Sequence, residues 1–245
     1  MPRFFVDACD TKGKSITITG EDVNHIKNVL RLKIGDEIII NDKEQTDYIC
    51  NISSFDGGVV VADIVDVIKN AAELPVKIVL FQGLPKLDKL EFIIQKAVEL
   101  GVSEIVPVIT KRTIVKVDSK KEEKKLARYQ AIATSAAKQS GRGVIPSVTN
   151  FMSYKQAIEY AADLDMVIVP YEEAKGISYS KEVISSIKGK KSLGVFIGPE
   201  GGFAKDEVDM ACDNGAVAIT LGHRILRTET AGLTTLSIIM FELEE

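Results

Sequence analysis

The sequence has no tryptophan, and it has only three cysteines and two histidines among its 245 residues. The cysteines, Cys9, Cys50 and Cys212, lie far apart, which argues against a disulfide framework or a Cys-x-x-Cys metal clip. The histidines, His25 and His223, are not spaced with cysteines or carboxylates as metal ligands are. No Gly-x-Ser-x-Gly element is present either. These absences disfavour metalloenzymes and serine hydrolases, and no metal is expected.

Long apolar runs are also missing. No stretch of 18 apolar residues occurs, and the first residues lack the apolar core of a signal peptide. We therefore expect no membrane span and a cytoplasmic protein. Hydrophobic residues nevertheless make up 45% of the chain and charged residues 27%, which is typical of a globular protein with a substantial core.

Positive charge is scarce overall, since the formal net charge is −4, but it is unevenly distributed. Residues 111–142 carry ten Lys and Arg against three Asp and Glu, whereas residues 1–70 and 200–245 are acidic. A basic stretch inside an acidic protein is the footprint expected for contact with a polyanion. A solvated helix with lysines that confer solubility explains the same charges, and charge alone favours that simpler interpretation.

The first 70 residues have the pattern of a small β-barrel. Short runs of β-branched and aromatic residues, separated by Gly, Asn and Asp, predict five strands. These runs are residues 4–6, 15–19, 37–40, 47–52 and 59–61. One helix is predicted between the second and third strands, because four apolar residues recur at helical spacing on one face. They are Val23, Ile26, Val29 and Leu30.

From residue 75 onward strands alternate with helices, which predicts βαβ units and a parallel sheet buried on both faces. The expected strands are residues 77–81, 105–109, 166–169, 193–197 and 216–221. A long basic helix is expected over about residues 122–140, and a final helix over about residues 229–243. We therefore predict two domains, 1–70 and 75–245, and the second by itself has the pattern of a doubly wound α/β sheet.

Two loops that follow predicted strands are candidates for a ligand site. The first, Gly198 to Phe203, is a glycine-rich turn that lets backbone N–H groups approach a ligand, but it matches neither the P-loop nor the dinucleotide fingerprint. The second, Leu221 to Gly232, places apolar residues beside two opposite charges, and Thr228 or Thr230 can cap the helix that follows. Two such loops at one sheet edge predict a pocket. Each alone also fits a tight turn or a surface ion pair.

Two groups of basic residues are candidates for nucleic-acid contacts. Lys138 and Arg142 flank the end of the basic helix, and Arg3, His25 and Arg31 lie around or before the first helix. Such side chains can contact phosphates or bases. Cations that complement a helix dipole, and scattered surface polarity, are the alternatives.

Several of these stretches, taken in order, resemble the bacterial 16S ribosomal RNA (uracil-N3)-methyltransferases, a branch of the SPOUT superfamily of knotted methyltransferases. The resemblance covers essentially the whole chain. The matching stretches are residues 2–5, 25–31, 89–102, 139–142 with Pro146, 197–203 and 221–231. The Gly-Pro-Glu-Gly-Gly and Ile-Leu-Arg-Thr-Glu-Thr-Ala segments are the most specific. The chain departs from the family pattern at Asn24, Leu87 and Ala204, where relatives often carry histidine, glycine and serine.

The resemblance implies a fold and a function that the patterns alone do not show. It implies a PUA-like β-barrel over residues 1–70 that helps to hold RNA, and a SPOUT-type α/β domain over residues 75–245 with a C-terminal trefoil knot. Knots are rare, so periodicity alone predicts an unknotted sheet. The implied reaction is methylation of N3 of a uridine in 16S ribosomal RNA of the small ribosomal subunit, usually assembled, with S-adenosyl-L-methionine as cofactor and a homodimer as the working unit. A catalytically silent RNA-binding or ribosome-assembly module is the alternative. A nucleotide-dependent oxidoreductase fits less well, because the dinucleotide fingerprint is missing.

Methyl transfer from a sulfonium requires two substrates held in line and one proton removed from N3. We assign Arg227 to stabilising the uracil anion, and Glu229 to orienting Arg227 or accepting that proton. The resemblance implies that the cofactor is held by Ile197, Gly198, Pro199, Glu200, Gly201, Gly202, Leu221, Gly222, Ile225, Leu226 and Thr230, with Tyr171 and Glu172 as weaker candidates. The expected RNA contacts are Arg3, His25, Arg31, Lys138 and Arg142.

Overall fold

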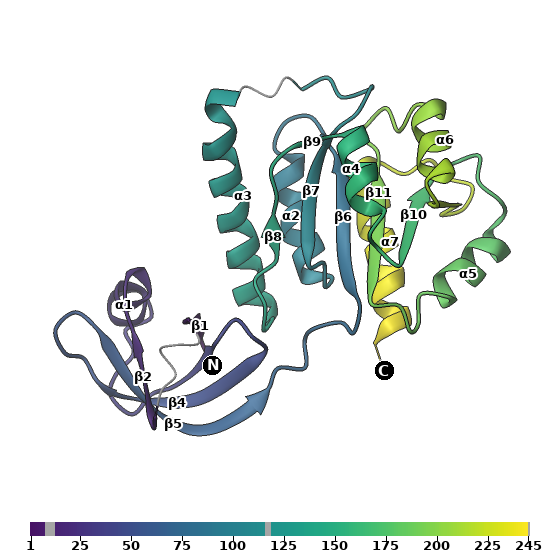
Figure 1. Cartoon of the computed structure of the whole chain (residues 1–245). Helices are drawn as coiled ribbons and strands as arrows, with labels where there is room; N and C mark the ends of the chain where they lie inside the picture. The colour runs from purple at the N-terminus through teal and green to yellow at the C-terminus, as the bar shows by residue number, and fades with distance from the viewer. Residues whose placement is uncertain (8–12, 116–118, 245) are drawn as a thin grey trace. The chain divides into compact units, whose positions relative to one another are not determined.

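The structure is a computed structural model, and it describes residues 1–7, 13–115 and 119–244, without the side chains of residues 119–121 (Figure 1). Contacts divide the chain into two compact units. The first unit is Met1–Glu73 with Ala137–Ile145, and the second is Leu74–Ala136 with Pro146–Glu245. None of the helices in the described ranges is long and apolar enough to cross a membrane.

The first unit contains a five-stranded sheet in the order β1-β3-β4-β5-β2. β1 runs parallel to β3, and the other neighbouring strands are antiparallel. Inward-facing residues at alternate strand positions, such as Ile38 and Ile40, form a hydrophobic core that is separate from that of the second unit. All five predicted strands are present. The elements are β1 (Arg3–Phe5), β2 (Ser15–Ile18), α1 (Glu21–Asn24), the π-helical turn η2 (His25–Val29), β3 (Glu37–Asn41), β4 (Thr46–Ser54) and β5 (Val60–Lys69).

The helix of this unit differs from the one that its apolar spacing predicts. Val23 and Ile26 are buried, but Val29 is 65% exposed and Leu30 is 39% exposed. The segment His25–Val29 is π-helical, and the Leu30 N–H donates to the His25 carbonyl at 2.9 Å. Because a π turn closes over five residues instead of four, positions 29 and 30 rotate off the buried face. The spacing-based prediction was wrong for these two residues.

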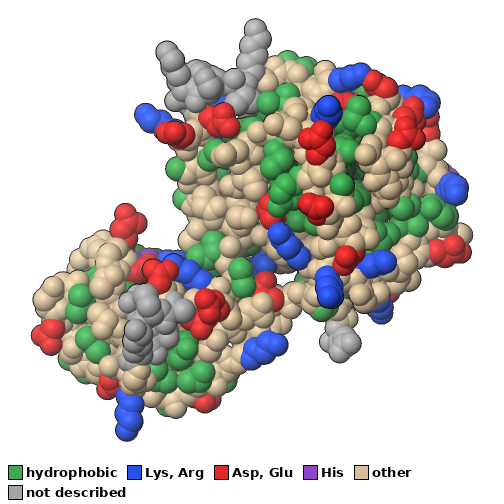
Figure 2. Space-filling view, viewed as in Figure 1, with side chains coloured by type: hydrophobic (Ala, Val, Ile, Leu, Met, Phe, Trp, Pro, Cys, Tyr) green, Lys and Arg blue, Asp and Glu red, His purple; other side chains and the backbone are tan. Residues whose placement is uncertain are grey.

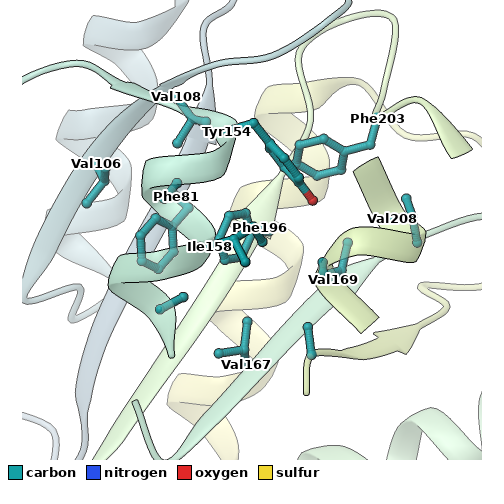
Figure 3. Close-up of a cluster of buried hydrophobic side chains, with 14 of the residues drawn as sticks. Phe81, Val106, Val108, Tyr154, Ile158, Val167, Val169, Phe196, Phe203 and Val208 are labelled. Atoms are coloured by element: carbon teal, nitrogen blue, oxygen red, sulfur yellow. The ribbon is translucent and has the colours of Figure 1, made fainter. Parts of the chain in front are cut away.

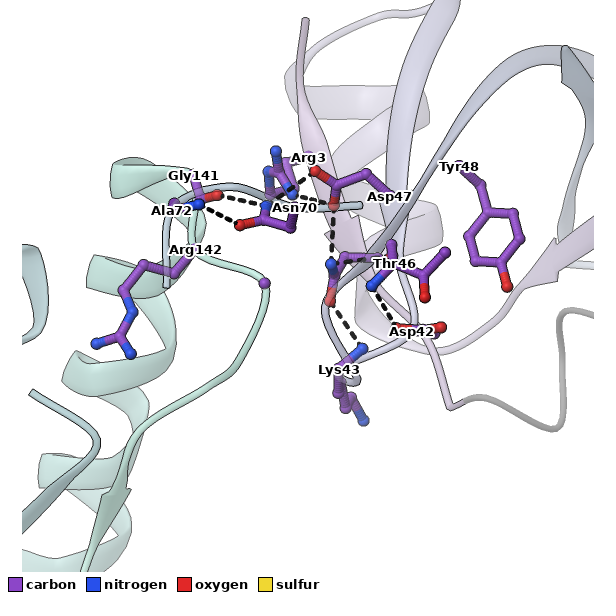
Figure 4. Close-up of polar contacts among 12 residues, drawn as sticks. Arg3, Asp42, Lys43, Thr46, Asp47, Tyr48, Asn70, Ala72, Gly141 and Arg142 are labelled. Carbon is purple, nitrogen blue, oxygen red and sulfur yellow. Dashed lines mark hydrogen bonds and ion pairs between the residues drawn. The ribbon is translucent and has the colours of Figure 1, made fainter. Parts of the chain in front are cut away.

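A polar cluster joins the strand ends of the first unit (Figure 4). The buried Asp47 accepts hydrogen bonds from the side-chain amides of Asn41 and Asn70, both at 2.8 Å, and pairs with Arg3. Asn70 also donates to the Gly141 carbonyl at 2.9 Å. A buried carboxylate is costly without such partners. These contacts explain why residues 137–145, which follow a long helix, belong to the first unit.

The second unit is built on a parallel sheet in the order β12-β10-β11-β6-β7-β8, with β9 also paired to β7. Every pairing in it is parallel, and its central strands are almost wholly buried, as predicted for a sheet covered by helices. Its strands are β6 (Lys77–Gly83), β7 (Glu104–Ile109), β8 (Ser147–Val148), β9 (Met152–Ser153), β10 (Met166–Pro170), β11 (Ser192–Ile197) and β12 (Val217–Ile219). Its helices are α2 (Lys89–Glu99), most of α3 (Ser119–Ser140), α4 (Tyr154–Ala161), α5 (Ile177–Ser185), α6 (Lys205–Asp213) and α7 (Thr228–Leu243).

Aromatic rings pack against one face of this sheet (Figure 3). Phe81 of β6 stacks on Phe196 of β11, with ring centroids 4.3 Å apart. Tyr154 of α4 lies edge-on to Phe196, and its hydroxyl donates to the Glu207 carbonyl at 2.7 Å. Phe203, which ends the loop after β11, packs into the same cluster. Both ends of that loop are therefore anchored in the core, because Phe196 and Phe203 flank it.

Candidate functional site

A pocket lies at the carboxyl ends of β10, β11 and β12, which is where ligands bind in open α/β sheets. The loops that follow these three strands supply most of its lining. The structure thus brings together the two loops singled out in the sequence. The predicted residues that line the pocket are Tyr171, Glu172, Ile197, Gly198, Pro199, Glu200, Gly201, Gly202, Leu221, Gly222, Ile225 and Leu226.

Glycine is required in the first of these loops because the backbone folds back on itself. A Cβ at Gly198 would lie 2.8 Å from the carbonyl carbon of Gly202, closer than real Cβ contacts allow. The Gly202 N–H closes the turn by donating to the Pro199 carbonyl at 2.9 Å, and Gly202 has φ +67°. The loop is therefore a compact backbone turn that presents main-chain groups to the pocket.

A buried hydroxyl links this loop to the start of α7. Thr228, which is 4% exposed, donates from Oγ1 to the Gly198 carbonyl at 2.6 Å. It accepts a hydrogen bond from Nε2 of the fully buried Gln82 at 2.9 Å. The sequence suggested Thr228 or Thr230 as the helix cap, but the N-cap position is Arg227 and no side chain caps the helix. Thr228 instead fixes the position of α7 against the ends of β6 and β11.

Two carboxylates beside the pocket share one lysine. Nζ of Lys89 lies 3.3 Å from Glu200 Oε1 and 3.4 Å from Glu229 Oε2. Glu200 also accepts a hydrogen bond from the Lys86 N–H at 3.0 Å. Burial acts to raise the pKa of Glu200, but this hydrogen bond and the contact with Lys89 outweigh it and lower the pKa below its usual value. Glu200 therefore stays ionised, with one oxygen already engaged.

The residues predicted to be catalytic lie at the start of α7, next to the lining residues. Arg227 is exposed, and within the described part of the chain its side chain has no ion-pair partner. Glu229 pairs with Lys89 and not with Arg227, and its Oε2 is buried without a hydrogen bond from the described residues. Thr230 is exposed and does not line the pocket. The arrangement places an exposed cation, Arg227, and a buried carboxylate oxygen, Glu229 Oε2, beside the same pocket.

Sequence reasoning missed several residues of this site. Arg112, which follows β7, lines the pocket and donates to the Gly201 carbonyl at 2.5 Å, and Arg224 also lines it. Position alone offered a signal for Arg112, because β7 is a parallel strand whose carboxyl end meets the same sheet edge. Gln82 and Lys89 offered no such signal, since their roles depend on packing against segments more than a hundred residues away.

Three of the five predicted RNA-contact residues have acidic partners within the first unit. Arg3 pairs with Asp47, and Lys138 pairs with Asp22 at 2.9 Å. The Arg142 guanidinium is 3% exposed and bonds to Glu73 through two nitrogens, at 3.1 and 2.5 Å. An RNA contact by Arg142 would require this pair to open. The other two predicted residues, His25 and Arg31, are exposed.

The basic helix α3 carries its charges on an exposed side. Lys124 is exposed, and Arg128 pairs with Glu91 of α2 at 2.7 Å. On the face shown in Figure 2, positive and negative side chains are interspersed and do not form one field of a single sign. Lys116 and the side chains of Lys120 and Lys121, which contribute to the basic stretch, lie outside the described residues, as does Cys9. No metal-binding cluster of His, Cys, Asp and Glu is found in the part of the chain that is described.

A family model described as an RNA methyltransferase domain matches residues 72–240, and one described as an RNA methyltransferase PUA domain matches residues 18–65. The chain is thus an RNA methyltransferase by class. It is 38% identical to ribosomal RNA small subunit methyltransferase E of Bacillus subtilis, over 100% of this chain and 98% of the relative. The corresponding protein of Mesomycoplasma hyopneumoniae is 35% identical, over 97% and 98% of the two chains.

A solved structure shows the same relationship. Ribosomal RNA small subunit methyltransferase E of Neisseria gonorrhoeae, bound to S-adenosyl methionine, is similar with a TM-score of 0.82 and 31% identity. The similarity covers 97% of this chain and 95% of that one. The chain belongs to the ribosomal RNA small subunit methyltransferase E family, which confirms the resemblance predicted from its motifs.

Proposed function

We propose that this protein transfers a methyl group from S-adenosylmethionine to N3 of a uridine in 16S ribosomal RNA. The observation that carries the proposal is that the loops 197–203 and 220–226 line the same pocket in a chain of this family. A relative that is similar over nearly the whole chain was solved with S-adenosyl methionine bound. Assembled small subunits are the proposed substrate form.

The pocket fits the chemistry of the cofactor. Apolar side chains of Ile197, Leu221 and Leu226 suit a flat adenine ring, and backbone groups around Gly198 and Gly222 suit polar edges and hydroxyls. The carboxylates of Glu172 and Glu200 suit a ligand that carries positive charge. Bound there, S-adenosylmethionine would supply an electrophilic methyl group on a positively charged sulfur.

The residues at the start of α7 manage the uracil proton. Uridine N3 must lose its proton to become a good nucleophile, and a cation stabilises the anion that results. Arg227 is exposed and lacks an acidic partner among the described residues, so its guanidinium is available for that anion. Glu229 holds a buried oxygen with no hydrogen bond from those residues, and a proton leaving N3 is accepted there.

RNA binding is assigned to the first unit and to α3. His25 and Arg31 are exposed, and within the described ranges they form no ion pair that RNA would have to break. Lys138, which is one-third exposed, can exchange Asp22 for a phosphate, whereas Arg3 and Arg142 hold the carboxylates of Asp47 and Glu73 in this unit. Phosphate contacts of this kind position RNA without reading its sequence.

Two features implied by the family resemblance are included in the proposal. The C-terminal segment is expected to form a trefoil knot, which is supported by α7 lying against β11 and bonding through Thr228 to both Gln82 and Gly198. A homodimer is expected, which is supported by the exposed apolar residues Phe241 (82%) and Ile238 (41%) on α7.

The test is a pair of measurements on the purified protein. Calorimetric titration with S-adenosylmethionine should show saturable binding, and labelled methyl should transfer to small subunits that lack the modification. Binding without transfer to any small-subunit RNA would leave the site without the proposed substrate. Absence of both would identify a catalytically silent RNA-binding module instead.

A further inference from the structure

Lys89 opens one of the stretches that match the family, but no role was predicted for it from the sequence. It is the first residue of α2, and it reaches two carboxylates that come from separate segments of the site. Glu200 belongs to the loop after β11, and Glu229 belongs to the first turn of α7. The Lys89 and Glu200 side chains are 30% and 31% exposed, and the Glu229 side chain is 20% exposed. The lysine therefore bridges two elements that must keep a fixed relationship around the pocket.

The lysine lies where helix electrostatics disfavour it. The N-terminus of an α-helix carries a partial positive charge, so a cation there is unfavourable. Lys89 is in the first turn of an 11-residue helix, so the stability of α2 does not explain its charge. The contacts with Glu200 and Glu229 do explain it, because both carboxylates gain a neutralising partner.

Without this ammonium group, the two carboxylates would face each other across the same space. Like charges repel, so the two segments that carry these carboxylates would tend to move apart. Glu229 Oε2 is buried and has no hydrogen bond from the described residues, so the contact with Lys89 Nζ is what holds this oxygen in position among them. A displaced Glu229 carboxylate would be misplaced for accepting the proton from N3.

We propose that Lys89 is a positioning residue for methyl transfer, which holds Glu200 and Glu229 together and keeps the buried oxygen of Glu229 ready as an acceptor. The inference depends on the proposed function only for its effect on methyl transfer. The contacts of Lys89 with Glu200 and Glu229 are features of the structure. Lys89 does not contact the reacting atoms in this role. It acts through Glu229 on the proton and through Glu200 on the shape of the cofactor loop.

The test compares Lys89→Met with Lys89→Arg and with the control Lys96→Met. Lys96 lies on the same helix, carries the same charge and, among the described residues, pairs with Glu99 of its own helix. With saturating cofactor and RNA, Lys89→Met should lower the single-turnover rate 10- to 100-fold, the loss expected when a reacting group is slightly misplaced. The dissociation constant for S-adenosylmethionine should change less than about fivefold. Lys89→Arg should recover the rate to within about fivefold of the parent, and Lys96→Met should stay within twofold.

A second readout needs no activity. Amide hydrogen exchange without cofactor should be at least about fivefold faster in Lys89→Met, in the peptides that cover residues 197–203 and the first turn of α7, and unchanged in Lys96→Met. If Lys89→Met exchanges and reacts like the parent, the bridge is an ordinary surface ion pair and the proposal is wrong. If cofactor affinity falls by the same factor as the rate, Lys89 is part of the binding site and the positioning role is also wrong.

Failure of the proposed function gives a different result from failure of the Lys89 proposal. If the parent protein transfers no methyl group, the reaction assigned above fails, and the exchange experiment still decides whether Lys89 holds the two segments together. Faster exchange in Lys89→Met alone would then support the bridge in a protein with another activity. Equal exchange in all variants would overturn the bridge whatever the activity is.

Discussion

Replacing Thr228 with valine tests how the loop 198–203, the proposed cofactor loop, is held in place. Valine keeps the branched shape of threonine but removes the hydroxyl that donates to the Gly198 carbonyl at 2.6 Å and accepts from Gln82 at 2.9 Å. Gln82 Nε2 keeps its hydrogen bond to the Gly83 carbonyl at 2.9 Å, so Gln82 loses only one of its two hydrogen bonds. The Gly198 carbonyl loses the hydrogen bond from Thr228, a residue that is only 4% exposed.

A buried polar group left without its partner costs about 1–3 kcal/mol. If this cost is met by movement of the loop, the dissociation constant for S-adenosylmethionine rises by about 5- to 150-fold, because each 1.4 kcal/mol corresponds to a factor of ten. If the loop stays in place, the same cost appears as a lower free energy of unfolding. Calorimetry and urea unfolding of the same preparation measure both quantities. Thr228→Ser keeps the hydroxyl and should resemble the parent in each.

The reasoning is refuted if Thr228→Val and Thr228→Ser have the same cofactor affinity and the same unfolding free energy as the parent. In that case the hydroxyl contributes nothing, and the loop is held by Phe203 and the neighbouring core alone. A loss confined to unfolding free energy would still support the hydrogen bonds but would place them outside cofactor binding.

Four further predictions follow from particular side chains. Arg227→Ala should lower turnover far more than cofactor affinity, and an equal loss of both in steady-state and binding assays would make Arg227 a cofactor ligand. Leu87 is 90% exposed at φ +57°, so Leu87→Gly should change unfolding free energy by between zero and about +1 kcal/mol, and a clear loss in urea unfolding would contradict the strain argument. Arg142→Gln leaves the mostly buried Glu73 side chain, which is 12% exposed, without its cation, and a loss of about 3 kcal/mol in unfolding free energy is expected; a change below about 1 kcal/mol would show that the pair is dispensable. Burial, aided by the charge of Asp63, raises the pKa of the Cys50 thiol to about 11. The folded state therefore keeps the thiol proton to a higher pH than the unfolded state does. The free energy of unfolding should fall between about pH 9 and pH 11, by at most about 3 kcal/mol. Cys50→Ala should flatten that part of the stability profile, and an unchanged slope would assign it to other groups.

Much of the fold was predictable because strands and helices of this chain have clear periodicity. The alternation from residue 75 onward predicted a parallel sheet, and the five short runs before it predicted the strands of the first unit. The helical spacing of Val29 and Leu30 predicted that both lie on the buried face, and this prediction was wrong. The Leu30 N–H donates to the His25 carbonyl, which adds one residue to that turn of the helix. Periodicity assumes 3.6 residues per turn and cannot register a local π turn.

The candidate site was predictable where it depends on loops at strand ends and not where it depends on long-range partners. The two loops around Gly198 and Gly222 were identified from their position and composition, and they line one pocket. The partners of Glu229 and Thr228 were not identified, because Lys89 and Gln82 lie about 140 residues earlier in the sequence and look like ordinary helix and strand residues. Arg3 and Arg142 were predicted to contact RNA, but they form ion pairs within the protein. The number of charges in a sequence does not show which of them are buried.

The most direct test of the central claim is the chemical identity of the product. Small ribosomal subunits that lack the modification would be incubated with the protein and labelled S-adenosylmethionine, and the RNA would be digested to nucleosides and separated by mass spectrometry. The proposed function predicts label in 3-methyluridine, with a loss of signal in Arg227→Ala. Label in a different methylated nucleoside, or no label in RNA from a folded protein that binds the cofactor, would contradict it.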